Sequence, residues 1–424
     1  MLIKFYDNTP LMSKHAAKRK WLPIDYHKRI NYIHSLVQFG AQVEYRSFGK
    51  LDWKASALGF GTMRLPIIGE DQAKVNEPEA IKLIRYAIDQ GVNYVDSAFT
   101  YHDGNSEVTL GKALAGKYRK KAKIATKMPV FSVKCKEDLD RILNMQMTRL
   151  NTSYIDFYLF HSLNKTLWNK VKKLNMLKWA EKQVAKGRLG YLGFSFHDEL
   201  EVFKEIVDSY DGWTLSQIQY NYLDENYQAG KTGLKYATSK GLAVVIMEPL
   251  AGGLLAVNPP EEIRKELEKA EVRRTPPEWA LQWVWSQPEV SVALSGMNSM
   301  QQVKENIESA KKSGANTLNS KELELISIAS ELYLKRGYIG CTQCRYCSHC
   351  PQGIGIPVIL ALLNKYSTKR REPKTKLKLK EAYDKAVPPA KRASNCIHCG
   401  QCEAVCPQHL PVRKLLSEAR ANFE

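Results

Sequence analysis

The sequence predicts an α/β protein, a (β/α)8 TIM barrel followed by a small cysteine-rich domain. Two observations predict this arrangement. Short apolar runs alternate with longer amphipathic segments through the central part of the 424-residue chain, which is the order of strands and helices in such a barrel. Eight of the nine cysteines lie after residue 340, so the last part of the chain has a composition of its own.

Eight apolar runs are predicted as strands, because nearly continuous apolar runs are expected where both faces of a parallel sheet are buried. They are Ala57–Gly61, Val92–Ala98, Lys123–Met128, Ile155–His161, Gly190–Phe196, Leu215–Tyr220, Ala243–Glu248 and Val290–Ser295. A doubly wound open sheet is the alternative. It would usually carry G-x-G-x-x-G after its first strand, and no such sequence stands there.

The segments between these runs are predicted as helices, since their apolar residues recur at helical spacing. Thr275 followed by Pro276 and Pro277 is a typical helix start. The predicted helices include Glu77–Gln90, Glu137–Leu150, Leu174–Lys186 and Pro276–Gln287. The isolated Cys135 is predicted to be a small buried apolar residue.

The formal net charge of +19 is concentrated at the two ends of the chain. Residues 1–42 are predicted to be a basic extension outside the fold, and one hypothesis is that translation begins at Val43. The barrel is assigned to residues 43–335 and the cysteine-rich domain to 336–424. A basic linker or surface loop is predicted at 365–394.

No apolar run approaches the roughly 20 residues of a membrane span. The chain does not open on a charged-then-apolar stretch with a small-residue cleavage site, so we expect neither a membrane span nor a secretory signal. The cytoplasm is the expected compartment.

Four polar residues stand at the ends of three consecutive predicted strands or on the adjoining loop. They are Asp96, Tyr101, Lys127 and His161. Because barrel active sites lie at the carboxyl ends of the strands, we expect these four side chains to share one site. A strand-end Asp is often a loop cap, and a lone His is often structural. The four residues together are therefore much stronger evidence for an active site than any one of them alone.

The four residue types suit the reduction of a carbonyl group by hydride. A Tyr hydroxyl could donate the proton, and because it titrates near pH ~10 it needs a nearby cation to become more acidic. Lys127 could supply that charge, Asp96 could hold Lys127 protonated, and His161 could orient the carbonyl. General acid catalysis of this kind accelerates a reaction about 10²–10⁴-fold.

The segments D-S-A-F-T-Y, I-A-T-K-M-P and F-Y-L-F-H, which hold these four residues, resemble the aldo/keto reductase superfamily, and the likeness covers roughly residues 43–335. The resemblance implies the four residues as the catalytic set and NAD(P)H bound without a Rossmann motif. It implies cofactor contacts at Thr62, Ser195, Gln217, Pro249, Leu250, Gly252, Ser295, Gly296, Met297, Gln302 and Asn306.

Three positions depart from the family pattern. Met247 stands where an aromatic usually stacks on the nicotinamide, and Phe196 stands where an Asn is usual. Gln302 replaces the basic residue that usually holds the 2′-phosphate, which weakens the expected preference for NADPH.

The remaining cysteines form two runs, each ending in Cys-Pro. The second run, C-x2-C-x2-C-x3-C-P, matches the bacterial ferredoxin pattern, in which the fourth cysteine serves the other cluster. The first run is one residue shorter before its last cysteine. We therefore expect Cys341, Cys344, Cys347 and Cys406 on one [4Fe–4S] cluster and Cys396, Cys399, Cys402 and Cys350 on the second.

Zinc is the alternative ligand, but zinc sites usually combine two separated cysteine pairs around one ion. The apolar stretches Ile354–Leu363 and Leu410–Ala419 look helical, so we expect a mainly helical, ferredoxin-like domain. The order of the two domains resembles that of a subgroup of aldo/keto-reductase-like proteins, which carry such a domain at the C-terminus.

The sequence thus predicts an oxidoreductase that acts on a small carbonyl substrate with NAD(P)H and passes single electrons through two clusters. Hydride carries two electrons and each cluster one, so a flavin could mediate, although no flavin motif is present. The alternatives are an electron-transfer module with a catalytically weak barrel, or a plain reductase with structural clusters. The basic insert could dock an acidic carrier such as a ferredoxin or flavodoxin. Nucleic acid is not expected there, because the lysine-rich stretch Lys365–Lys380 has no aromatic residue interleaved with its charges besides Tyr366.

Overall fold

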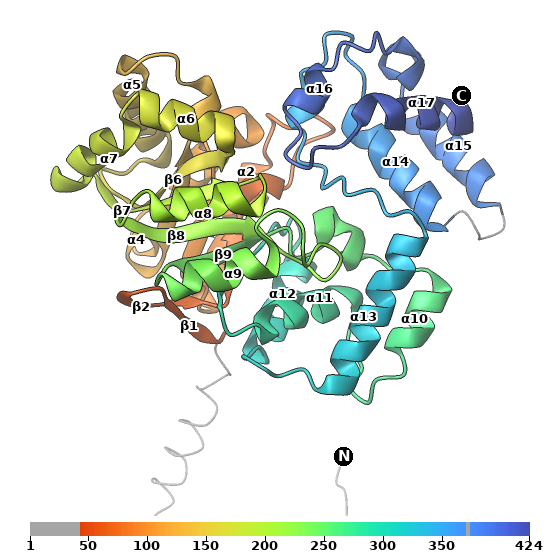
Figure 1. The fold of residues 1–424 in the computed structure, drawn as a ribbon, viewed down its shortest axis with the longest axis horizontal. Coiled ribbons are helices and arrows are strands. Elements are labelled where there is room, and N and C mark those ends of the chain that lie inside the picture. The colour runs from red at the N-terminus through yellow and green to blue at the C-terminus, as the bar shows by residue number, and fades with distance from the viewer. Residues whose placement is uncertain (1–42, 370–373) are drawn as a thin grey trace, which may run out of the picture. The chain divides into compact units, whose positions relative to one another are not determined.

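The computed structural model describes residues 43–369 and 374–424 (Figure 1). The predicted N-terminal extension and the proposed start at Val43 therefore concern a segment, 1–42, that lies outside the described residues. In the described part of the chain, no helix is both long and apolar enough to cross a membrane.

Eight parallel strands close into a barrel, in the order β10-β3-β4-β5-β6-β7-β8-β9. This confirms the (β/α)8 prediction and excludes the doubly wound sheet. The strands are β3 (Leu58–Gly61), β4 (Tyr94–Asp96), β5 (Lys123–Met128), β6 (Ile155–Leu163), β7 (Leu189–Phe196), β8 (Trp213–Gln219), β9 (Ala243–Met247) and β10 (Val290–Ser295).

Helices surround this barrel. Thr275 accepts a hydrogen bond from the Glu278 backbone N–H, so the predicted helix start is confirmed. The helices are α2 (Glu77–Asp89), α3 (Asn105–Ala113), α4 (Tyr118–Lys121), α5 (Glu137–Leu150), α6 (Lys165–Lys173), α7 (Met176–Ala185), α8 (Leu200–Asp208), α9 (Gly230–Ser239), α10 (Glu261–Leu267), α11 (Pro276–Ser286), α12 (Met300–Lys311) and α13 (Ser320–Lys335).

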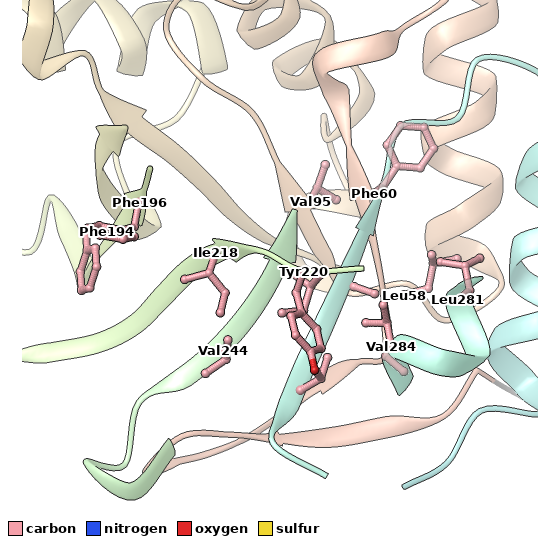
Figure 2. Packing of buried hydrophobic residues seen from close by; sticks show 14 of the residues in the cluster. Leu58, Phe60, Val95, Phe194, Phe196, Ile218, Tyr220, Val244, Leu281 and Val284 are labelled. Atoms are coloured by element: carbon pink, nitrogen blue, oxygen red, sulfur yellow. The ribbon is translucent and has the colours of Figure 1, made fainter. Parts of the chain in front are cut away.

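The main core lies between the strands and the outer helices. Figure 2 shows Leu58 of β3 close to Leu281 and Val284 of α11, with Phe60 farther along the same strand, and all four are fully buried. Burying side chains of this size removes large apolar areas from water, which is the dominant favourable contribution to folding. This packing holds the strand ends in fixed positions.

A hairpin of β1 (Tyr45–Phe48) and β2 (Leu51–Ser56) precedes the barrel and was not predicted. Phe48 is fully buried, and its ring centroid lies 4.8 Å from that of Phe157 inside the barrel. Gly49 makes the turn with φ of +58°, which glycine adopts without strain. The hairpin adds aromatic side chains to the barrel interior.

The C-terminal domain is mainly helical, as predicted. It contains α14 (Ile356–Lys369), α15 (Thr375–Ala386), the short α16 (Gln401–Ala404) and α17 (Val412–Phe423). Helices α14, α15 and α17 pack against one another (Figure 1). Their buried apolar side chains form a core separate from that of the barrel.

The prediction of a linker or loop at 365–394 is wrong. Most of this segment is helical, in the end of α14 and in α15. The Tyr383 ring is fully buried on α15, with its centroid 5.4 Å from that of Phe423, and Lys380 Nζ donates to the Phe423 carbonyl at 2.7 Å. The many lysines concealed an amphipathic helix that contributes to the domain core.

The prediction that Cys135 is buried is also wrong, because its side chain is exposed. Cys135 lies in the loop before α5, where its backbone N–H donates to the Asp138 carboxylate at 3.2 Å. The contact fixes the backbone at the helix start and leaves the thiol on the surface.

Candidate active site and cysteine sites

The four strand-end residues come together at the carboxyl ends of the strands, as expected. Lys127 Nζ lies 2.6 Å from Asp96 Oδ1 and 2.7 Å from the Ser97 carbonyl oxygen. It also lies 5.2 Å from the centroid of the Tyr101 ring, which is 6.0 Å from that of His161. The sequence-predicted set is therefore one site in space.

Asp96 and Lys127 form an ion pair with almost no solvent contact, their side chains being 4% and 0% exposed. Burial raises the pKa of Asp96 and lowers the pKa of Lys127, while the attraction between the two charges opposes both shifts. Gln217 Nε2 adds a 3.0 Å hydrogen bond to the second Asp96 oxygen. The carboxylate is thus held from two sides.

Tyr101 differs from the expectation that Lys127 makes its hydroxyl more acidic. Burial raises the pKa of Tyr101 well above its usual value, and the neighbouring Tyr346 and Asp96 raise it further. Among the described residues, no hydrogen bond joins Lys127 Nζ to the Tyr101 hydroxyl, because the ammonium is directed to Asp96 and Ser97.

His161 has one ring nitrogen engaged and one without a partner. Its Nε2 lies 3.0 Å from the Tyr346 hydroxyl, whereas Nδ1 has no hydrogen-bond partner among the described residues. Burial lowers the pKa of His161 well below its usual value, and Lys127 lowers it further. The imidazole is therefore neutral near pH 7 and acts through hydrogen bonds rather than charge.

A pocket of about 440 Å³ opens above these residues, bounded by both the barrel and the cysteine-rich domain. The predicted residues that line it are Asp96, Tyr101, His161, Pro249, Leu250, Gly252, Ser295, Gly296, Met297, Gln302 and Asn306. Thr62, Lys127, Ser195 and Gln217 were also predicted, but they belong to the wall behind the lining.

Residues behind the lining hold it in place. The Thr62 hydroxyl donates to the Asp96 carbonyl oxygen at 2.9 Å. Ser195 Oγ accepts a 2.8 Å hydrogen bond from the Ser162 backbone N–H, which leaves its own hydroxyl hydrogen free to donate. Among the residues that the structure describes, the Gln217 Oε1 atom is buried without a partner. An unused acceptor and an unused donor hydrogen therefore lie behind the pocket lining.

The part of the pocket assigned to a nucleotide is organised by local hydrogen bonds. Asn306 Nδ2 donates to Ser295 Oγ at 3.0 Å, and Gln302 Oε1 accepts from the Asn298 backbone N–H at 2.8 Å. Within the described part of the chain, the positive side chain that lines the pocket is Arg64, which lies 3.7 Å from the Glu248 carboxylate.

The sequence did not predict that residues of the cysteine-rich domain would line the barrel pocket, although Cys344 was predicted as a cluster ligand. These residues are Thr342, Cys344, Tyr346, Pro407 and Gln408. Sequence reasoning also missed Arg64, whose guanidinium donates to the Thr342 carbonyl oxygen at 2.6 Å. The signal for Tyr346 was its place between two cysteines, but only the docking of the domain shows where its side chain goes.

The chain around Cys406 is fastened to the barrel as well. Gln228 Nε2 donates to the Pro407 carbonyl oxygen at 2.8 Å, and Gln408 Nε2 donates to Gln219 Oε1 at 2.6 Å. Tyr227 donates to the Gln408 carbonyl oxygen at 2.9 Å. Both segments that hold the first group of cysteines are thus attached at the mouth of the barrel.

The first group of cysteines comprises Cys341, Cys344, Cys347 and Cys406. Burial, together with the neighbouring Cys406, raises the pKa of Cys341 to about 11 and of Cys344 to about 12. Burial and neighbouring thiols raise the pKa of Cys347 in the same way. The four sulfurs are thus close enough to interact, and bringing them together unpaired is unfavourable. Such a set suits a cationic inorganic core that stabilises thiolates.

The second group, Cys350, Cys396, Cys399 and Cys402, lines a small cavity of about 20 Å³ with apolar neighbours. Cys399 is exposed there, and Arg413 stands at the rim. Four thiols around one apolar cradle are the donor set of a four-iron cluster. The grouping is the one that the spacing of the runs predicts.

A closed parallel barrel with these polar residues at its mouth, joined to a helical cysteine-rich domain, defines an oxidoreductase with an iron–sulfur domain. The chain belongs to the aldo/keto reductase family, whose model matches residues 57–329. A second model, described as a 4Fe-4S dicluster domain, matches residues 340–411. That match favours iron–sulfur ligation over zinc.

Several known proteins are similar to about two thirds of the chain. L-galactose dehydrogenase of Arabidopsis thaliana is 28% identical over 294 residues, covering 63% of this chain and 88% of that protein. The holo form of aldo-keto reductase AKR11C1 from Bacillus halodurans is 25% identical with a TM-score of 0.56, covering 68% of this chain and 96% of that one. A Klebsiella pneumoniae aldo-keto reductase in complex with NADPH, at 23% identity and a TM-score of 0.55, covers 68% of this chain and 94% of its own and shows the fold alone.

Proposed function

We propose that the chain transfers hydride between NAD(P)H and a small carbonyl or alcohol, in a pocket beside the first of two [4Fe–4S] clusters. The observation that carries this proposal is the convergence of Tyr101, His161 and the Asp96–Lys127 pair on one pocket of about 440 Å³. The cysteine-rich domain contributes further residues to the lining of that pocket.

The pocket wall suits a nicotinamide. A carboxamide offers one acceptor oxygen and an NH₂ donor. The Ser195 hydroxyl can donate to the oxygen, and the unpartnered Gln217 Oε1 can accept from the nitrogen. Arg64 supplies positive charge for phosphate, although Glu248 lies beside it. With Gln302 as an uncharged residue, we expect at most a modest preference for NADPH over NADH.

When bound, the nicotinamide supplies a hydride and each cluster exchanges one electron. The residues of the chain provide the remaining chemistry. Tyr101 gives its proton to the carbonyl oxygen as that oxygen becomes negative, and neutral His161 orients the oxygen by a hydrogen bond. The Lys127 ammonium, held by Asp96, lies 5.2 Å from the centroid of the Tyr101 ring, so its charge opposes the burial that raises the pKa of Tyr101 but does not overcome it.

The two cysteine groups suggest an order for electron transfer. The first group lies at the pocket, since Cys344 belongs to its lining. The second group contains the exposed Cys399. We therefore propose that an external carrier exchanges electrons at the second cluster and that the first cluster exchanges them with the barrel.

A second candidate function is an electron-transfer module whose barrel is a docking scaffold. The observation that favours it is the 3.0 Å contact between Tyr346 and His161 Nε2, because it engages the nitrogen that a carbonyl would need. Met247 also favours the electron-transfer module, because it stands where an aromatic residue usually stacks on the nicotinamide.

The test is turnover by the anaerobically purified protein with NADPH or NADH and a panel of aldehydes and ketones. Replacing Tyr101 by Phe removes only the proton donor, so we expect kcat to fall at least about 100-fold while nucleotide affinity and folding are kept. Turnover within a few-fold of wild type would contradict the role of Tyr101. No turnover and no nucleotide binding by either protein would favour the scaffold.

A further inference from the structure

Tyr346 lies between two cluster cysteines, Cys344 and Cys347, yet its side chain reaches the barrel site. It begins the short 3₁₀ turn Tyr346–Ser348, and its hydroxyl lies 3.0 Å from His161 Nε2. The same side chain lines the pocket that contains Tyr101. One residue therefore belongs to both the cysteine run and the reductase site.

The contact lies where the proposed reaction needs a substrate. A carbonyl oxygen that takes a proton from Tyr101 must lie within hydrogen-bond reach of that hydroxyl and of His161 Nε2. The rings of Tyr101 and Tyr346 both meet the His161 ring edge-on, with centroids 6.0 and 6.2 Å from it. The Tyr346 hydroxyl thus occupies the hydrogen-bonding position at Nε2, where a carbonyl oxygen would accept from His161 with its proton on Nε2.

The surroundings hold Tyr346 in this position. Phe131 packs against both partners, with ring centroids 5.7 Å from His161 and 6.5 Å from Tyr346. Arg64 fixes the same segment through the Thr342 carbonyl oxygen at 2.6 Å. The hydroxyl is therefore a built part of the pocket rather than the end of a freely rotating surface side chain.

We propose that Tyr346 is a specificity-determining residue, whose hydroxyl a substrate carbonyl must replace at His161. This rests on the proposed function. A carbonyl enters only if its oxygen competes with the phenol and its body fits beside the cysteine run. The segment that ligates the first cluster therefore selects among small carbonyl compounds.

The test measures binding of benzaldehyde to the cluster-loaded full chain in the presence of NADP⁺, where no hydride is available for turnover. Tyr346→Phe keeps the ring and removes the competing hydrogen bond, so its dissociation constant should fall about five-fold, with a matching fall in KM. Tyr338→Phe is the matched control, since this tyrosine of the same segment has a buried, unpartnered hydroxyl and does not line the pocket. It should bind benzaldehyde as the wild type does.

Iron content and NADP⁺ affinity are measured for all three proteins, so a change in cluster loading is seen directly. Equal or weaker benzaldehyde binding by Tyr346→Phe, in protein that still reduces aldehydes, would overturn the inference alone. If none of the three proteins binds NADP⁺ or benzaldehyde, the proposed function fails and the inference fails with it.

Discussion

The buried pair of Asp96 and Lys127 shows how a single residue can matter to both stability and chemistry. The two side chains meet at 2.6 Å with almost no exposure to solvent. Removing one partner of such a pair leaves an uncompensated charge, whereas removing both is often tolerated. Asp96 therefore both compensates the charge of Lys127 and keeps its ammonium group near Tyr101.

We expect Lys127→Met to destabilise the barrel by about 3–5 kcal/mol, because Asp96 would be left buried without its cation. The double variant Asp96→Asn, Lys127→Met should recover part of this loss. The urea midpoint of unfolding, followed by circular dichroism, compares the two proteins. A single variant that is as stable as the double variant would show that the pair is not coupled in this way.

At the same scale, the sequence predicted the four catalytic candidates and the pairing of Asp96 with Lys127, but not the contact of His161 with Tyr346. Asp96, Lys127 and His161 each follow a local apolar run. Each could therefore be assigned to the carboxyl end of a strand from its neighbours in the sequence. Tyr346 could not, because it meets His161 across 185 positions of sequence. A residue whose role depends on the docking of two domains leaves no local pattern.

Helices and strands were predictable where burial of one face or of both faces gives the apolar residues a regular spacing along the sequence. Strands β5 and β10 and helix α5 match their predicted bounds residue for residue. The hairpin β1–β2 was missed because its short strands mix apolar and charged residues. Helix α15 was mistaken for a loop because its many lysines face solvent, although Thr375 and Tyr383 are buried.

The cradle of the second cysteine group suggests a test at this scale. Cys399→Ser should leave one cluster without a full set of thiolates, so iron should fall from about eight to about four atoms per chain. Exposed Cys135 offers the matched control, and Cys135→Ser should keep all the iron. Full iron content in Cys399→Ser would show that this residue is not a ligand.

The exposed lysines of α15 form the candidate docking surface for an acidic electron carrier. We expect reversal of Lys374, Lys376 and Lys378 to Glu to slow reduction of the clusters by a reduced acidic ferredoxin about ten-fold at low salt, because complementary charge acts mainly on association. Added salt should slow the wild type towards the same rate.

The matched control reverses three exposed lysines of the barrel helices, Lys173, Lys178 and Lys182. It should react with the carrier nearly as fast as the wild type. Equal rates for both triple variants, or no dependence on salt, would mean that α15 serves the domain core and not a carrier.

For the whole molecule, the pocket is built by parts of the chain that are far apart in sequence. Arg64 and Thr342 meet across 278 positions, and Gln228 meets Pro407 across 179. The sequence predicted a barrel and a cysteine-rich domain as separate parts, with a proposed boundary after residue 335, which is also where α13 ends. How closely the two parts share one site could be learned only from their docking.

Every proposal for the C-terminal domain depends on two four-iron clusters, and the metal content of anaerobically purified protein tests this most directly. We predict about eight irons and eight acid-labile sulfides per chain, with the visible absorption of iron–sulfur charge transfer. Stoichiometric zinc in a colourless protein would contradict the assignment.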